Sequence, residues 1–212
     1  MKYLYMSVIA PAFVLVPVSA ALIRYRALTR AMRVLFGYLV LTAVVNAVST
    51  LLAENGHSNL EIFHVYTIVE SVLLLQFFYL TFRQRRPKRL TRLLMIAFPL
   101  LCCLNFIFIQ SISGFNTYTR PVECVLFMAL CLAYWWQAGD AETGGSWTAV
   151  PVNWVLSGLL LYFSSAFFLF IFTNFMFTQY SRAVNETIWN IHATLVAIMY
   201  LLFAIGFSKC NR

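Results

Sequence analysis

Glu70 is the residue with the strongest potential for chemistry, because it is a carboxylic acid in the middle of the apolar segment 62–82. An ionised carboxylate at the centre of a membrane-spanning helix costs about 2.5–3.5 kcal/mol on insertion scales. We therefore expect Glu70 to be protonated, paired or in contact with water. Tyr66 lies four residues earlier on the same helical face, so a hydrogen bond within the helix is one way to satisfy the acid.

Other polar side chains occur at a similar depth in neighbouring apolar segments. Asparagine, histidine, tryptophan and a second glutamate lie in the half that we assign to the outside, whereas the inner half is almost purely apolar. A water-filled, outward-facing pocket is the simplest arrangement that satisfies these groups together. The candidate ligand-binding residues are Asn46, His64, Tyr66, Glu70, Glu123, Asn174, Trp189 and His192.

This set is suited to binding a small solute. Amides and imidazoles orient a ligand through hydrogen bonds, and Glu70 adds a titratable group that could couple binding to protons. The alternative is that each polar group makes one buried hydrogen bond that only stabilises the fold. No helix carries an HxxxH or ExxxH pair, so we predict no metal site. We predict no catalytic residues and no cofactor, because no nucleophile, base and acid have a recognisable spacing.

The composition identifies the environment in which these residues act. Of 212 residues, 62% are hydrophobic and 10% are charged, and the mean hydropathy is +0.80. A soluble domain is about 45–50% apolar and about 25% charged, so a soluble enzyme and a nucleic-acid-binding domain are excluded. We attribute the net charge of +8 to the loops of a membrane protein and expect no nucleic-acid partner.

Seven apolar segments are each long enough to cross a hydrocarbon core about 30 Å thick. Because lipid leaves backbone groups without water, each segment is expected to be a helix. We predict an all-α, polytopic membrane protein with a single transmembrane domain over residues 1–212. The predicted spans are 6–23, 34–53, 62–82, 93–112, 121–137, 152–177 and 187–207.

The distribution of Lys and Arg predicts the orientation. The loops after the first and third spans and the C-terminal tail hold twelve basic residues. The opposite side holds three, which are Lys2, Arg120 and Arg182. The positive-inside rule then places the N-terminus outside and the C-terminus in the cytoplasm.

The loop after the third span is strongly basic. Its cationic side chains would each attract an anionic lipid headgroup by about 1 kcal/mol. The alternative is that they only fix the topology. The candidate headgroup-binding residues are Arg83, Arg85, Arg86, Lys88 and Arg89.

One sequence offset suggests an internal repeat. Asn46 and Asn174 are 128 residues apart, and so are His64 and His192. The offset relates spans two and three to spans six and seven in the same direction. With the fourth span as a linker, it predicts a 3+1+3 parallel duplication.

The chain contains the pattern His64-x-Tyr66-x-x-x-Glu70, followed by Leu73-Leu74, Trp189-x-x-His192 and Phe203-x-x-Gly206-Phe207. It resembles a group of small, uncharacterised bacterial seven-helix membrane proteins. The resemblance implies a bacterial inner (plasma) membrane and no particular activity. Rhodopsins have a Schiff-base lysine in the seventh span, which this chain lacks, and it also lacks the Pro-Gln pair of SWEET and PQ-loop transporters.

Three functions follow from these observations. The leading hypothesis is a multi-pass membrane protein that binds or transports a small solute in an outward-facing polar pocket. The second is a membrane sensor or assembly subunit that acts through a protein partner. The third is an intramembrane enzyme that modifies lipid. The expected partners are the lipid bilayer, a small-molecule ligand and, for the second hypothesis, another protein.

Overall fold

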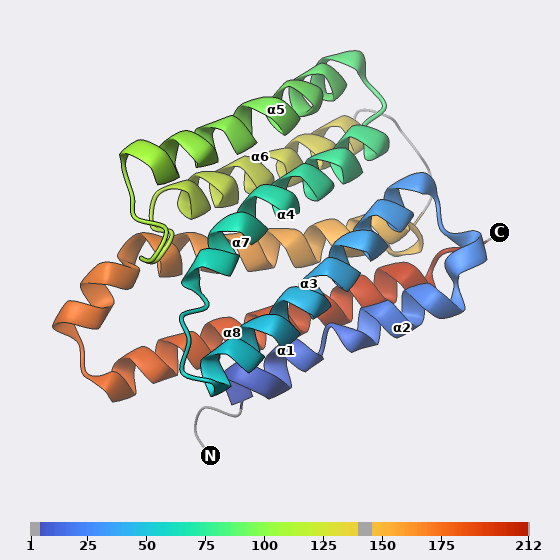
Figure 1. Ribbon diagram of the computed structural model, residues 1–212. Helices are drawn as coiled ribbons and strands as arrows, with labels where there is room; N and C mark the ends of the chain where they lie inside the picture. The colour runs from blue at the N-terminus through green and yellow to red at the C-terminus, as the bar shows by residue number, and fades with distance from the viewer. Residues whose placement is uncertain (1–4, 140–145, 212) are drawn as a thin grey trace.

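The protein is almost entirely helical in the computed structural model, which describes residues 5–139 and 146–211 (Figure 1). Within those residues, seven helical segments are long and apolar enough to cross a membrane. They are Tyr5–Ile23, which comprises η1 (Tyr5–Ile9), α1 (Ala10–Ala12) and α2 (Leu15–Ile23), then α3 (Arg30–Glu54), α4 (Leu60–Thr81), α5 (Arg85–Phe108), α6 (Thr119–Gly139), α7 (Pro151–Gln179) and α8 (Arg182–Ser208). Two short 3₁₀ turns, η2 (Tyr25–Ala27) and η3 (Trp147–Ala149), precede α3 and α7.

These helices confirm the all-α class and support a multi-pass membrane protein. Their ends differ from the predicted spans, because helices continue past the apolar segment into polar residues. α5 begins at Arg85 rather than 93, and α6 begins at Thr119 rather than 121. Lys2 and Arg212, which entered the count of basic residues, lie outside the described residues.

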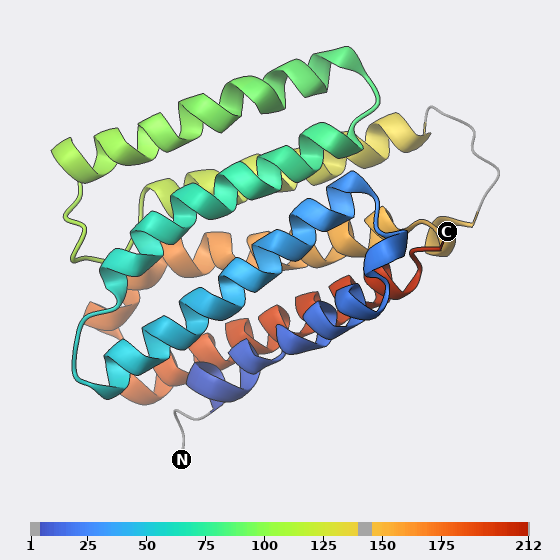
Figure 2. The same cartoon turned by 45° about the vertical axis from the view of Figure 1, so that its right-hand side comes forward.

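The helices form a ring with one member outside it. α3 packs on α4, α6 on α7 and α7 on α8, while α2 packs against both α8 and α3 and closes the ring. α5 lies outside and packs mainly against α4 (Figures 1 and 2). The C-terminal ends of α2, α4, α6 and α8 lie at one end of the bundle, and those of α3, α5 and α7 lie at the other (Figure 1).

One half of the ring is filled by aromatic rings. At the end where α4 finishes, Phe78 stacks on Phe127 with centroids 6.0 Å apart, and Phe127 stacks on Phe163 at 4.9 Å. These three side chains and Phe203 are fully buried. Phenyl rings from α4, α6, α7 and α8 therefore seal this half of the bundle, and we call them the phenyl layer.

Two prolines interrupt the first segment. Proline has no backbone N–H, so Pro17 cannot donate to the carbonyl of Phe13 in the helical pattern. Hydrogen bonds between residues three apart replace the α-helical bonds between residues four apart here. Phe13 N–H donates to Ala10 O at 3.2 Å, and Val16 N–H donates to Phe13 O at 3.0 Å. The segment that closes the ring thus keeps a helical backbone at Phe13 and Val14, but it is tightened to 3₁₀-type bonds between α1 and α2.

We predict that Gly206→Ala destabilises the contact between α7 and α8. A Cβ at Gly206 would lie 2.9 Å from the backbone oxygen of Pro151, so the helices would have to separate. We expect a loss of about 1–3 kcal/mol in the free energy of unfolding, measured by titration with a denaturing detergent. Gly37→Ala is the control, because a Cβ there meets nothing within 4 Å and Ala favours a helix by about 0.5–1 kcal/mol. Equal effects of the two substitutions would contradict the described packing.

Candidate functional site

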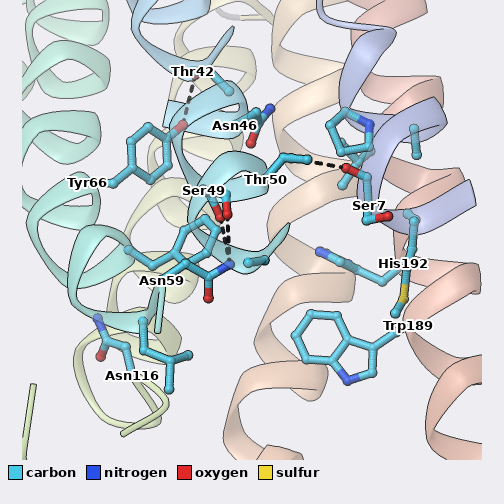
Figure 3. Close-up of a pocket in the computed structure, with 18 of the residues that line it drawn as sticks. Ser7, Thr42, Asn46, Ser49, Thr50, Asn59, Tyr66, Asn116, Trp189 and His192 are labelled. Atoms are coloured by element: carbon cyan, nitrogen blue, oxygen red, sulfur yellow. Dashed lines mark hydrogen bonds between the residues drawn. The ribbon is translucent and has the colours of Figure 1, made fainter. Parts of the chain in front are cut away.

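A cavity of about 720 Å³ occupies the half of the ring that the phenyl layer leaves open. This volume lies in the range of about 300–1,000 Å³ that is typical of small-molecule sites. Residues of η1, α1, α3, α4, α6, α7 and α8 line it, together with the turn at 114–116. Figure 3 shows Tyr66 and Asn59 on one wall and Trp189 and His192 on the opposite wall. The cavity extends to the exposed Glu54 near the end of α3.

A buried cluster of three charged side chains lies at the floor of this cavity. Nη1 of Arg120 donates to the carboxylates of both Glu70 and Glu123, and its Nη2 donates to the hydroxyl of Tyr162. The exposed fraction is 5% for Arg120 and 0% for each glutamate. The hydroxyl of Tyr38 donates to the other oxygen of Glu70 at 3.1 Å. We call Arg120, Glu70 and Glu123 the charge cluster; it joins α4 to α6, and the two tyrosines extend it to α3 and α7.

Arg120 corrects the sequence analysis, which assigned it to an external loop. It lies in the first turn of α6 and is buried. Asn116 fixes this turn, because its side-chain oxygen accepts the backbone N–H of Arg120 at 3.2 Å and the hydroxyl of Thr119 at 2.6 Å. The signal that could have revealed the site is the spacing of Arg120 and Glu123, which lie three residues apart and so share a helical face.

Tyr66 does not pair with Glu70, contrary to the hydrogen bond that its spacing suggested. Its hydroxyl is instead 2.9 Å from the hydroxyl of Thr42. The Thr42 hydroxyl donates its one hydrogen to the backbone oxygen of Tyr38 at 2.8 Å, so it accepts from Tyr66. Nearer the mouth, the amide of Asn59 donates to the hydroxyl of Ser49 at 2.8 Å. Polar pairs between α3 and α4 therefore line one wall (Figure 3).

The two predicted histidines both line the cavity. His64 is 1% exposed, and its Nε2 lies 2.8 Å from the backbone oxygen of Gly114. Nδ1 of His192 lies 3.1 Å from the hydroxyl of Ser165. Among the described residues, Nδ1 of His64 and Nε1 of Trp189 have no hydrogen-bond partner although both atoms are buried. Both side chains line the cavity, but these two atoms are closed off from its open space.

Not all of the predicted residues meet in this cavity. Asn46, His64, Tyr66, Trp189 and His192 line it, while Glu70 and Glu123 reach it through Arg120 and the tyrosine hydroxyls. Asn174 lies elsewhere, in an open groove between α6 and α7, with its amide 3.5 Å from the hydroxyl of Thr117. No group of three metal-ligating side chains occurs among the described residues.

The basic residues of the α4–α5 connection lie at the opposite end of the bundle from the cavity mouth. Arg83, Arg85, Arg86 and Arg89 are exposed, and Lys88 is half-buried with its amino group 5.8 Å from the centre of the Tyr79 ring. This end of the bundle carries cationic side chains, whereas the mouth carries Glu54.

The start of the first segment contributes to the cavity wall. Pro11 cannot donate to the carbonyl of Ser7, four residues earlier, because it has no N–H. That carbonyl accepts a hydrogen bond from the hydroxyl of Thr50 at 3.4 Å (Figure 3). Serine and threonine side chains commonly compensate backbone groups in this way within membranes. Irregular backbone at this depth is therefore tied to a residue of α3 that also lines the cavity.

We predict that Arg120→Met destabilises the protein far more than the triple substitution Arg120→Met, Glu70→Gln and Glu123→Gln. The single change leaves two buried carboxylates without a counter-charge, at a cost of about 3–5 kcal/mol, whereas removal of every charge is expected to be close to neutral. The free energy of unfolding in detergent measures the difference. If the triple variant were the less stable of the two, the charge cluster would not be held by electrostatic compensation.

No protein-family model matches the chain, and no curated protein and no solved structure is significantly similar to it.

Proposed function

We propose that the protein binds a small solute in the cavity and carries it across the membrane. The main support is a ligand-sized cavity, lined by polar side chains of α3, α4 and α8, above a charge cluster. A cavity of this size, with a few polar groups among mostly apolar walls, has the arrangement typical of small-molecule sites.

The ring of helices is sealed at one end and hollow at the other, and this difference supports transport rather than binding alone. The phenyl layer seals one end while the cavity extends toward the other, so a solute would have access from one side only. A carrier with alternating access has such one-sided states.

The proposed access is from the non-cytoplasmic side of the membrane, which we take to be a bacterial inner membrane. With Arg120 inside α6, the external count of basic residues falls from three to two, against twelve on the other side. The positive-inside bias therefore strengthens. The 3+1+3 repeat stays a prediction: its two histidines line one cavity, whereas its two asparagines line different ones.

We predict that Ser58→Cys, beside the cavity mouth, reacts with a membrane-impermeant maleimide in intact cells. Arg89→Cys, near the start of α5, should react only after the cells are permeabilised, because it lies at the other end of the bundle. The unsubstituted protein, with its own cysteines, gives the background. Labelling of Arg89→Cys alone in intact cells would reverse the proposed orientation and the side from which the cavity opens.

We predict that Asn46→Trp abolishes ligand binding by filling the cavity. Representative amines, carboxylates, sugars and nucleosides serve as probes of the thermal unfolding of the purified protein. A ligand at 100 times its Kd stabilises by about 2.7 kcal/mol, which is roughly 5–10 °C for a chain of this length. We expect one chemical class to produce such a shift in the wild-type protein and none in the variant.

Asn174→Trp is the matched control, because it introduces the same side chain in the other groove and should keep the shift. A hit should also exchange across the membrane of proteoliposomes in a counterflow assay. Absence of a shift with every class, or an equal shift in Asn46→Trp, would contradict solute binding in this cavity.

A further inference from the structure

The cavity and its floor carry an excess of negative charge. Within the part of the chain that the structure describes, the charged groups of the lining and the charge cluster are Arg120, Glu70, Glu123 and Glu54. One positive group thus faces three acidic ones. The histidines of the walls add no formal charge when neutral.

The charge cluster has a net charge of −1 when both of its acids are ionised, so one proton or one cation would make it neutral. Glu70 is fully engaged, since one oxygen accepts from Arg120 and the other from Tyr38. Glu123 binds Arg120 through one oxygen, while its other oxygen is buried and has no partner among the described residues. An uncompensated buried carboxylate is costly, so the second acid must hold a proton or have a cation nearby.

The groups around the cluster do not supply this missing charge. They come from α3, α4, α5, α6, α7 and α8, and each is neutral in its ordinary state near pH 7. They are Tyr38, Tyr66, Cys102, Cys124, Tyr162, His192 and Tyr200.

The walls favour a cation that has an apolar body. They include eight aromatic side chains, and aromatic faces attract ammonium groups by about 0.5–2 kcal/mol. An anion would be bound less well, because Arg120, the only buried guanidinium among the described residues, is already paired with both carboxylates. The aromatic side chains of the lining are Tyr38, Phe63, Tyr66, Phe115, Tyr162, Phe170, Trp189 and Tyr200.

We propose that the solute is an organic cation, an amine or quaternary ammonium with an apolar group, and that it exchanges against one proton of the charge cluster. The inference rests on the proposed function and specifies its substrate. The hydroxyl of Tyr38 bonds to Glu70 and lines the cavity, and Arg120, which also lines it, bonds to both acids; these two side chains connect the acids to it. The cation enters the cavity, the proton leaves Glu123 or Glu70 for the water, and no covalent bond to the solute forms or breaks.

Three probes with the same aromatic group test the charge preference: benzyltrimethylammonium, benzyl methyl sulfone and phenylmethanesulfonate, which are cationic, neutral and anionic. Calorimetric titration of the purified protein in detergent measures their affinities between pH 5 and 9. We expect the cation to bind most tightly, with an affinity that rises by up to about tenfold per pH unit where the proton is displaced. Buffers of different ionisation enthalpy should report the release of up to one proton per cation.

Glu123→Gln removes the excess charge and keeps the pair of Arg120 with Glu70. We expect its affinity for the cation at high pH to fall by about tenfold or more, and proton release to vanish. Glu123→Asp should restore both in part. Glu61→Gln is the control, because its carboxylate is exposed and lies outside the cavity lining, and it should keep both the affinity and proton release. The pH series on the wild-type protein needs no variant and so does not depend on how well these fold.

Tighter binding of the anion, an affinity for the cation that falls as pH rises, or binding of none of the probes would overturn the inference. Equal binding of the neutral and cationic probes would also overturn it. That last result would leave solute binding in the cavity intact, since it is tested separately by Asn46→Trp.

Discussion

The compensation of one buried guanidinium is the interaction on which the rest of the structure depends. An arginine inside an apolar bundle is costly unless its charge is paired and its N–H groups are bonded. Arg120 meets this condition with Glu70 of α4, Glu123 of its own helix and Tyr162 of α7. Because α4 and α6 have few other contacts, this cluster is also the main polar link across that part of the ring. The site and the packing of the bundle therefore have the same physical origin.

The number and type of the helices were predictable, because apolar length alone decides whether a segment can span a bilayer. The polar contacts were less so. Glu70 was identified as a residue that needs a partner, but its partners lie 32 and 50 residues away on other helices. Periodicity along one helix predicts only neighbours on that helix, which is why it suggested Tyr66. Arg120 was missed because a charge at the edge of an apolar segment is ordinarily assigned to the adjacent loop.

The cavity results from a change in side-chain type between the two ends of the helix ring. At one end, phenyl rings interlock without polar atoms and fill the space, as Phe127 does between Phe78 and Phe163. At the other end, tyrosine hydroxyls must reach partners, and small side chains such as Ser49 and Ala193 line the walls. Directional hydrogen bonds hold these walls in place while leaving space between them. The same six elements can thus be close-packed at one end and hollow at the other.

The second glutamate is the feature that stability alone does not explain. One carboxylate is sufficient to neutralise Arg120, and Glu70 already binds it while accepting a further hydrogen bond from Tyr38. Glu123 adds a buried oxygen that bonds to nothing among the described residues, and burial of such a group is unfavourable. An apolar residue of similar size would pack there without that cost. The proposed exchange of one proton for another positive charge in the cavity would explain why an acid occupies this position.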